Sequence, residues 1–282
     1  MKETVKEKHR LLQEVLRDTG GCAVAFSGGV DSTLVLEEAR RQLGERCVAV
    51  IAASPAYPRR ERERALQWVR ENRIRHVVLD SAETDIPGFR SNGPERCYFC
   101  KRELFAGVRE VARSNGLPRV VDGTNRDDLD DYRPGMRAAR ELGVLSPLLE
   151  AGITKEEARI ISREVYRLPA WDRPAMACLA SRFPYGTEIT PEKLGKVERI
   201  EELLEARGLA GGRARHHGDI LRLELPPGRL ATALEEKVRG PLLELARELG
   251  FLYVTLDLEG YRPGSLNRAL EQPPGGGSKK ER

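Results

Sequence analysis

Apolar runs alternate with amphipathic segments along the first 166 residues of the chain. Short apolar runs are typical of buried strands, and they occur at residues 22–26, 47–52, 76–79, 119–122 and 144–149. Apolar residues spaced three or four positions apart predict helices, which we place at residues 4–18, 33–41, 59–72, 101–115 and 154–166. This alternation predicts an α/β fold with a doubly wound parallel sheet, whose ligands collect at the carboxyl ends of the strands.

The pattern changes in the last third of the chain. We expect a helix at residues 190–207, a hairpin at 214–225, a helical stretch at 229–249 broken at Pro241, and a strand at 251–257. These elements predict a small α+β domain at residues 187–268, for substrate binding or oligomerisation, after a larger domain at residues 1–186. The tail at residues 269–282 is rich in Pro, Gly and Lys, and we expect it to be disordered.

The hexapeptide Ser27-Gly-Gly-Val-Asp-Ser32 lies between the first strand and its helix. A sharp turn from strand into helix leaves backbone N–H groups unpaired, and these groups with the helix dipole form an anion site. Gly28 and Gly29 let the backbone approach the anion, while Ser27 and Ser32 add hydroxyl donors. A capped turn is the alternative, but the complete hexapeptide favours a phosphate site.

This phosphate loop resembles the PP-loop of the ATP pyrophosphatase superfamily, whose members cleave ATP between the α and β phosphates. Asp31 therefore belongs to the predicted ATP site. A Walker-type kinase or GTPase is not supported, because no GxxxxGK(S/T) run occurs in the chain.

Neighbouring strand ends supply further candidates for nucleotide binding. Ser54 and Gly123-Thr124-Asn125 lie where a nucleotide would extend from the loop, although Gly-Thr-Asn also forms ordinary turns. Four aspartates follow, at positions 127, 128, 130 and 131. They are either a solvated charge run or oxygen ligands for Mg²⁺.

The net charge of +4 is unevenly placed. Residues 187–282 carry 16 basic and 16 acidic residues, whereas a module that holds a polynucleotide is usually basic. We therefore expect small-molecule substrates and no nucleic acid. Because the sequence has no run of eighteen apolar residues and no signal-peptide core, we expect a cytoplasmic protein with no membrane partner.

Five cysteines are present, and they fall into two groups. Cys22 and Cys47 lie in apolar runs, where cysteine packs as a small hydrophobe. Cys97 and Cys100 form a CxxC pair at the start of a predicted helix, where the helix dipole and Lys101 favour the thiolate.

The third cysteine outside the apolar runs is Cys178, in a loop rich in Pro and small residues. With the CxxC pair, three readings are open: a redox dithiol, a zinc site completed by Cys178 and His216 or His217, or three ligands of a [4Fe–4S] cluster. Three cysteines beside an ATP-cleaving loop favour the cluster, with one iron left open to carry sulfur.

Several motifs together resemble the LarE family, the sulfur transferases of nickel-pincer cofactor biosynthesis, which serves lactate racemization. They are Ser27–Ser32, Cys97–Phe105, Asp122–Asp128 with Asp131–Gly135, Cys178–Arg182 with Pro184–Gly186, Arg213–Asp219 and Gly260–Gly264. The resemblance spans residues 5–267. It implies the adenine nucleotide α-hydrolase-like fold and a homo-oligomer, a hexamer in this family.

The resemblance also implies an activity and site residues. The family uses ATP to adenylate a carboxylate of pyridinium-3,5-biscarboxylic acid mononucleotide and converts it to a thiocarboxylate. Some members give up the sulfur of one cysteine, which matches Cys178, while others use three cysteines and a [4Fe–4S] cluster. Cys97 and Cys100 imply the second type, so all three cysteines are expected to be catalytic and to bind the cluster. The residues expected to bind the substrate are Ser181, Arg182, Arg213 and Arg215, with Glu201 and Glu224 on the acidic side of the pocket.

Two other functions fit part of the sequence. A PP-loop [4Fe–4S] tRNA thiolase would share the loop and the cluster, but the charge-balanced C-terminal part and the lack of further CxxC pairs disfavour it. A sensor that binds a nucleotide and iron–sulfur or zinc would bind ATP without releasing pyrophosphate.

Overall fold

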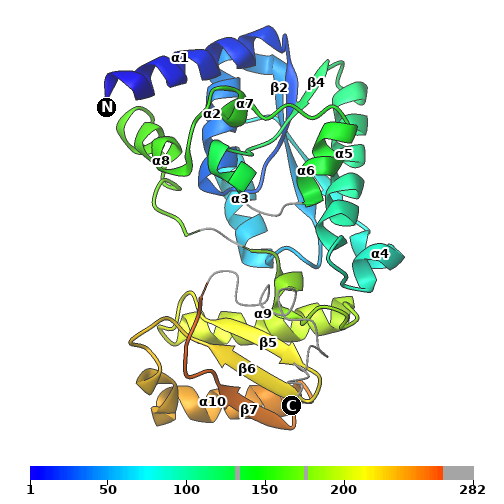
Figure 1. The fold of residues 1–282 in the computed structure, drawn as a ribbon, viewed down its shortest axis with the longest axis vertical. Coiled ribbons are helices and arrows are strands. Elements are labelled where there is room, and N and C mark those ends of the chain that lie inside the picture. Colours follow the sequence, from blue (N-terminus) through cyan, green and yellow to red (C-terminus); the bar gives the residue numbers. More distant parts are fainter. Residues whose placement is uncertain (131–133, 175–176, 263–282) are drawn as a thin grey trace, which may run out of the picture. The chain divides into compact units, whose positions relative to one another are not determined.

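A four-stranded parallel sheet lies at the centre of the first part of the chain in the computed structural model, which describes residues 1–130, 134–174 and 177–262 (Figure 1). The strands are β1 (Cys22–Ala25), β2 (Cys47–Ala53), β3 (His76–Asp80) and β4 (Arg119–Val121), in the order β3-β2-β1-β4. Every neighbouring pair is parallel. The predicted α/β fold is confirmed.

Helices cover both faces of this sheet. The helices up to residue 164 are α1 (Glu3–Asp18), α2 (Val30–Leu43), α3 (Arg59–Glu71), α4 (Pro87–Arg90), α5 (Arg96–Ser114), α6 (Pro134–Glu141), α7 (Pro147–Glu150) and α8 (Lys155–Glu164), and α4 is not among those that cover the sheet. Alternate residues of one strand face opposite layers: Val24 packs with α1, α2, α3 and α8, and Ala23 packs with α5 and α6. Burial on both faces explains why the strands read as continuous apolar runs.

Cys22 and Cys47 are core residues, as predicted. They are register partners on β1 and β2, and both are buried. The hydrogen bond with Cys47 and burial raise the pKa of Cys22, which keeps this thiol protonated.

The strand predicted at residues 144–149 is wrong. Leu145 alone pairs with the sheet: its N–H donates to Val120 O at 3.0 Å, and its carbonyl accepts from Asp122 N–H at 2.9 Å. Pro147 then opens the short helix α7. Proline lacks the N–H that a strand would need and suits the first position of a helix, so it ends the pairing.

The second part of the chain forms a small α+β unit. Its sheet has the order β5-β6-β7, with β5 (Arg213–His217) antiparallel to β6 (Ile220–Glu224) and β6 parallel to β7 (Tyr253–Leu256). The hairpin turn includes Gly218 at φ +65°, a conformation that glycine adopts readily. The helices are α9 (Pro191–Ala206) and α10 (Glu236–Glu248).

Two details of the predicted helix at 229–249 are wrong. The helix α10 starts at Glu236, after a 3₁₀ turn at Ala231–Leu234, and Pro241 lies inside α10 without ending it. Val238, Leu242 and Ala246 are buried along one face of α10. This packing holds the helix together although proline removes one backbone hydrogen bond.

The chain divides into two compact units between Ala177 and Cys178, and residues 90–94 belong to the second unit. The sequence placed this boundary after residue 186. Segment 178–186 is joined to the second unit by hydrogen bonds of Arg182 with Glu201 and of Arg215 with Ser181 O. Residues 90–94 go with this segment, because Asn92 donates to Pro184 O at 2.8 Å. The predicted tail lies outside the described residues.

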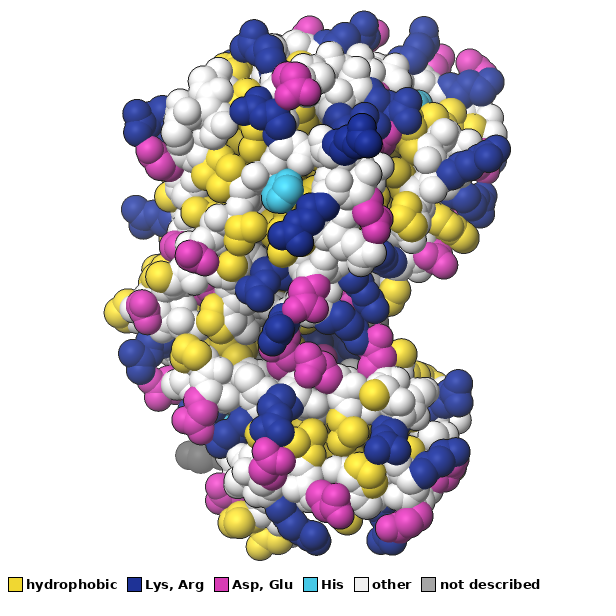
Figure 2. Space-filling model, turned by 180° about the vertical axis from the view of Figure 1, so that it is seen from behind, with side chains coloured by type: hydrophobic (Ala, Val, Ile, Leu, Met, Phe, Trp, Pro, Cys, Tyr) yellow, Lys and Arg dark blue, Asp and Glu magenta, His cyan; other side chains and the backbone are white. Residues whose placement is uncertain are grey.

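Charges of both signs lie side by side at the surface. On the face shown in Figure 2, Lys and Arg side chains lie among Asp and Glu side chains. Among the described residues, none of the helices combines the length and the apolar character that a membrane span requires.

A buried hydrogen-bond network joins α1, α2 and the end of α8. Glu38 is fully buried, and its carboxylate accepts from Gln42 at 2.9 Å and from Tyr166, and lies 2.8 Å from His9 Nε2. Burial acts to raise the pKa of Glu38, but the hydrogen bonds from His9 and Tyr166 outweigh it and hold that pKa below its usual value.

We expect Glu38→Gln to lower the free energy of unfolding at neutral pH by about 1–3 kcal/mol, because the amide loses charge-assisted hydrogen bonds. A carboxyl group with a lowered pKa stabilises the fold above its unfolded-state pKa, and this contribution disappears as the pH falls through the lowered value. Urea unfolding between about pH 6 and pH 3 should therefore show a shallower pH dependence for Glu38→Gln than for the parent chain. Glu14→Gln, at an exposed position of α1, is the control and should match the parent. Equal pH dependence in Glu38→Gln and the parent would contradict this role.

Candidate active site

The phosphate loop runs from Ser27 at the end of β1 into α2. Gly28 has φ +72°, and Gly29, the residue before α2, has no side chain to cap the helix. The hydroxyl groups of Ser27 and Ser32 lie 3.0 Å apart, and Ser27 N–H donates to Ser32 Oγ at 3.3 Å. The first N–H groups of a helix have no acceptor within that helix, so the phosphate site predicted at the start of α2 stays a prediction.

Gly123 brings the end of β4 against this loop. A Cβ atom at Gly123 would lie 2.8 Å from Ser32 N, a distance that the two backbones permit only to glycine. Asp122 holds the next residue in place, because its carboxylate accepts from Thr124 N–H at 3.1 Å and from Thr124 Oγ1 at 2.7 Å. The structure thus brings Gly123 and Thr124 to the loop, and buried Asn125 follows them.

Asp31 forms an ion pair with Lys155, the first residue of α8. Burial raises the pKa of Asp31 although the Lys155 ammonium acts to lower it. Among the described residues, the Oδ1 atom of Asp31 is buried and has no hydrogen-bond partner. A buried carboxylate oxygen without a partner fits a cation such as Mg²⁺.

The sequence analysis did not single out Lys155. It placed a helix at residues 154–166, and in the structure Thr154 and Glu157 form a capping box that opens α8. A lysine in the first turn of a helix is disfavoured by the helix dipole, and that placement was the available signal.

Two of the four aspartates predicted as a solvated charge run or as Mg²⁺ ligands accept hydrogen bonds from the backbone. Asp127 Oδ2 accepts from Lys155 N–H at 2.9 Å, and Asp128 Oδ2 accepts from Asn125 N–H at 2.9 Å. These bonds fix the loop after β4 against the start of α8. Asp131 lies outside the described residues.

Ser54, at the end of β2, connects to two acidic residues that the sequence reading did not single out. Its hydroxyl donates to Glu83, which is buried and also accepts from Ser81. The Ser81 hydroxyl lies 2.6 Å from Glu103 Oε2 on α5. A chain of hydrogen bonds therefore leads from the predicted nucleotide edge of the sheet to the helix that carries the CxxC pair.

The CxxC pair lies in the first part of α5, which begins at Arg96, five residues before the predicted start. Cys97 is exposed and Cys100 is half-buried, and residues three apart on a helix lie on the same face. Helix α6 packs here, since a Cβ at Gly135 would lie 2.8 Å from Lys101 Cγ.

Cys178 is half-buried and begins the second unit. Within the described residues, no group of three His, Cys, Asp or Glu side chains is placed to hold a metal ion. The common centre of Cys97, Cys100 and Cys178 stays a prediction.

The residues predicted to bind substrate are gathered within the second unit. Arg182 is fully buried and forms two hydrogen bonds of 2.8 Å with Glu201. Arg182 Nη1 donates to Ser181 Oγ at 2.8 Å, and Arg215 donates to Ser181 O at 2.7 Å and pairs with Glu224.

Arg213 differs from these paired arginines. It is 7% exposed, its guanidinium lies 4.8 Å from the centre of the Tyr261 ring, and its hydrogen bonds go to the carbonyl groups of Gly211 and Gly212. In the part of the chain that the structure describes, it forms no ion pair. Burial and the charge of Arg182 lower the pKa of Arg213, so an anion bound there would relieve an unfavourable positive charge.

His216, one of the two predicted zinc ligands, packs as a core residue. Its ring lies 5.2 Å from the Phe183 ring and 5.3 Å from the Phe251 ring, measured between centres. Burial lowers the pKa of His216, which favours the neutral imidazole.

Comparison with known proteins identifies the family, although no protein-family model matches the chain. The pyridinium-3,5-bisthiocarboxylic acid mononucleotide synthase of Lactiplantibacillus plantarum is 36% identical over 272 residues, which cover 95% of this chain and 96% of that protein. The chain belongs to the LarE family. The predicted resemblance is confirmed.

Further relatives of this LarE-family chain agree with the fold. An uncharacterized protein of Synechocystis sp. is 44% identical over 269 residues, covering 94% of this chain and 99% of that protein. A GMP synthase of Aeropyrum pernix is 28% identical over 224 residues, covering 71% of this chain and 43% of that protein. The parallel sheet with helices on both faces is consistent with the PP-loop α/β fold.

The ion pair between Asp31 and Lys155 can be measured in the LarE-family chain by a double-mutant cycle. Lys155→Met leaves a buried carboxylate without its cation, so we expect it to cost about 1–2 kcal/mol more stability in the parent than in an Asp31→Asn background. Urea unfolding of the four chains gives this coupling energy.

The control cycle uses Arg113→Met and Glu110→Gln, an exposed pair on α5 with an N–O distance of 2.5 Å. It should show much weaker coupling, because exposed ion pairs are screened by water. A cost of Lys155→Met that is independent of the Asp31 charge would refute a stabilising role for the pair.

Proposed function

We propose that this chain is an ATP-dependent sulfur transferase. It adenylates the carboxylates of pyridinium-3,5-biscarboxylic acid mononucleotide and converts them to thiocarboxylates, as a step in making a nickel-pincer cofactor. The observation that carries this proposal is the similarity to pyridinium-3,5-bisthiocarboxylic acid mononucleotide synthase over nearly the full length of both proteins.

The phosphate loop and its neighbours would bind ATP. Its phosphates lie at Ser27, Gly28, Gly29 and Ser32, with the nucleoside toward Ser54 and the Gly123–Asn125 segment. The buried Oδ1 atom of Asp31 supports a place for Mg²⁺ beside the phosphates.

Two steps follow from ATP at this loop. A substrate carboxylate oxygen attacks the α-phosphorus, and the bond from that phosphorus to the oxygen bridging to the β-phosphate breaks. Pyrophosphate leaves and stays at the loop. A hydrosulfide then attacks the activated carbonyl carbon, AMP departs with the carboxylate oxygen, and the sulfur gives up its proton to leave a thiocarboxylate.

Arg213 would bind an anionic group of the substrate. A buried guanidinium whose hydrogen bonds go to carbonyl groups suits a phosphate or carboxylate, and Ser181, Arg182 and Arg215 adjoin it in the same unit. The ion pairs with Glu201 and Glu224 would fix the orientation of Arg182 and Arg215.

Cys97, Cys100 and Cys178 would hold a [4Fe–4S] cluster, which when bound would carry a sulfide on the iron that has no cysteine ligand. Two observations support a cluster at these residues. Cys97 and Cys100 are about one helical turn apart, and Cys97 is exposed while Cys100 is half-buried. The start of α5 favours their thiolate forms.

The test combines ATP, Mg²⁺, sodium sulfide and the pyridinium mononucleotide with the anaerobically reconstituted chain. We expect AMP and pyrophosphate in equal amounts and a thiocarboxylate product by mass spectrometry. Pyrophosphate released with tRNA, and not with the mononucleotide, would indicate a thiolase; nucleotide binding without any pyrophosphate would indicate a sensor.

Cysteine variants test the source of sulfur. We expect Cys97→Ala, Cys100→Ala and Cys178→Ala each to abolish the visible iron–sulfur absorption and multiple turnover, because each removes one of three ligands. Cys22→Ala, a core substitution, is the control and should keep both. Full activity of Cys97→Ala, with Cys178 converted to dehydroalanine, would show single use of Cys178 instead.

For Arg213→Met we expect the KM for the mononucleotide to rise about 10- to 100-fold with little change in the KM for ATP, because a charge-assisted contact to the substrate is lost. Arg199→Met is the control, since Arg199 pairs with Glu248 at the surface of the same unit. An unchanged KM for the mononucleotide in Arg213→Met would place the substrate elsewhere.

A further inference from the structure

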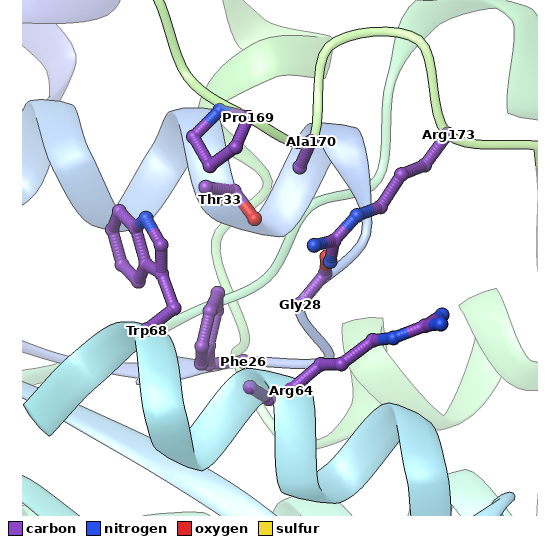
Figure 3. Close-up of a pocket in the computed structure, with 9 residues that line it drawn as sticks. Phe26, Gly28, Thr33, Arg64, Trp68, Pro169, Ala170 and Arg173 are labelled. Carbon is purple, nitrogen blue, oxygen red and sulfur yellow. The ribbon is translucent and has the colours of Figure 1, made fainter. Parts of the chain in front are cut away.

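A small pocket lies beside the phosphate loop in the first unit (Figure 3). Phe26 and Trp68 line it on one side, and Ala170 comes from the segment after α8. Thr33 is buried there, and its hydroxyl has no hydrogen-bond partner among the described residues. Figure 3 shows Arg64 and Arg173 at the end of the pocket where Gly28 lies.

The backbone that carries Arg173 is fixed to α8. Arg159 donates to Trp171 O at 3.0 Å and to Arg173 O at 2.8 Å. The Arg163 guanidinium lies 5.2 Å from the centre of the Trp171 ring. Arg173 is therefore presented from a braced segment, and its side chain reaches Gly28 O at 3.2 Å.

The two arginines at this end of the pocket have different partners. Arg64 donates to Glu61 at 2.7 Å, which compensates its charge. Arg173 forms no ion pair with any residue in the described ranges, and its hydrogen bond is to a neutral carbonyl of the phosphate loop. A guanidinium has five N–H donors and prefers phosphate or carboxylate oxygens.

The position of Arg173 indicates which part of a bound nucleotide would lie next to it. Gly28 belongs to the turn before α2, where unpaired N–H groups attract phosphates, whereas the nucleoside would extend toward Ser54 and Gly123. A cation hydrogen-bonded to Gly28 therefore adjoins the pyrophosphate end of ATP and not the adenosine end.

We infer that Arg173 binds the pyrophosphate moiety of ATP, exchanging its hydrogen bond with Gly28 O for phosphate oxygens when the nucleotide arrives. This inference rests on the proposed function, since it requires ATP at the phosphate loop. It gives Arg173 two effects: tighter binding of ATP, and compensation of the negative charge that develops on the leaving pyrophosphate.

The test measures binding of inorganic pyrophosphate, ATP and AMP, each with Mg²⁺, by titration calorimetry. For Arg173→Met we expect about tenfold or weaker binding of pyrophosphate and ATP, the loss typical of a charge-assisted hydrogen bond, and unchanged binding of AMP. Arg173→Lys, which keeps the charge without the planar fork, should bind pyrophosphate with intermediate affinity.

Arg163→Met is the matched control, because Arg163 contacts the same segment through Trp171 and pairs with Glu164 away from the phosphate loop. It should bind all three ligands like the parent. Thermal unfolding checks that each variant is folded. If Arg173→Met does not fold, the pyrophosphate affinity of Arg173→Lys is compared with that of the parent instead.

The outcomes separate this inference from the proposed function. Parent-like pyrophosphate affinity in Arg173→Met, or an equal loss of affinity for AMP and pyrophosphate, would overturn the role of Arg173 alone. A parent chain that binds neither ATP nor pyrophosphate would overturn the nucleotide site and the role of Arg173 together.

Discussion

The N–H groups at the start of α2, which have no acceptor within the helix, determine how the surrounding segments of the first unit are arranged. They need a tight turn after β1, a backbone free of side chains, and partners that keep the turn in place. Gly123 supplies the close approach from β4, and Tyr57 donates to Ser27 O. Lys155 pairs with Asp31 from the start of α8, and Arg173 donates to Gly28 O from the segment that follows. Four segments far apart in sequence thus hold one turn.

These contacts place both positively and negatively charged groups around the predicted anion site. Two helix starts, α2 and α8, and two cations raise the local positive potential, while Asp31 and Asp127 offset it. Because Asp31 Oδ1 has no partner in the described chain, a further cation such as Mg²⁺ could be bound there.

The second unit places its charges differently. Arg182, Arg215 and Glu224 are buried, and Arg182 pairs with half-buried Glu201 while Arg215 pairs with Glu224. Burying charge costs desolvation energy that an apolar core would avoid. A purely structural core would not need them. Their position beside Arg213, a buried cation without an ion pair in the described residues, makes sense if the unit binds an anion with a defined orientation.

Much of the fold and part of the site were readable from the sequence. Burial on both faces makes a parallel strand a continuous apolar run, so residues 22–26 and 47–52 identified β1 and β2 and placed Cys22 and Cys47 in the core. The pattern of apolar residues in a segment shows which of its own residues are buried. The phosphate loop could be found in the same way, because its motif lies within one short segment between a strand and a helix. Arg213 and Arg215 share a strand, where residues two apart lie on one face.

Only the tertiary structure decided the contacts between distant segments. The partner of Asp31 is 124 residues away, and Ser54 meets Glu83 through neighbouring strand ends. The strand expected at residues 144–149 contributes one bridge before Pro147 opens a helix, and α10 continues through Pro241 because its face is buried. The hydrophobic periodicity of a segment determines which of its residues face a core. Which charged residues form pairs depends on how distant segments pack together, and no single segment of the sequence encodes that packing.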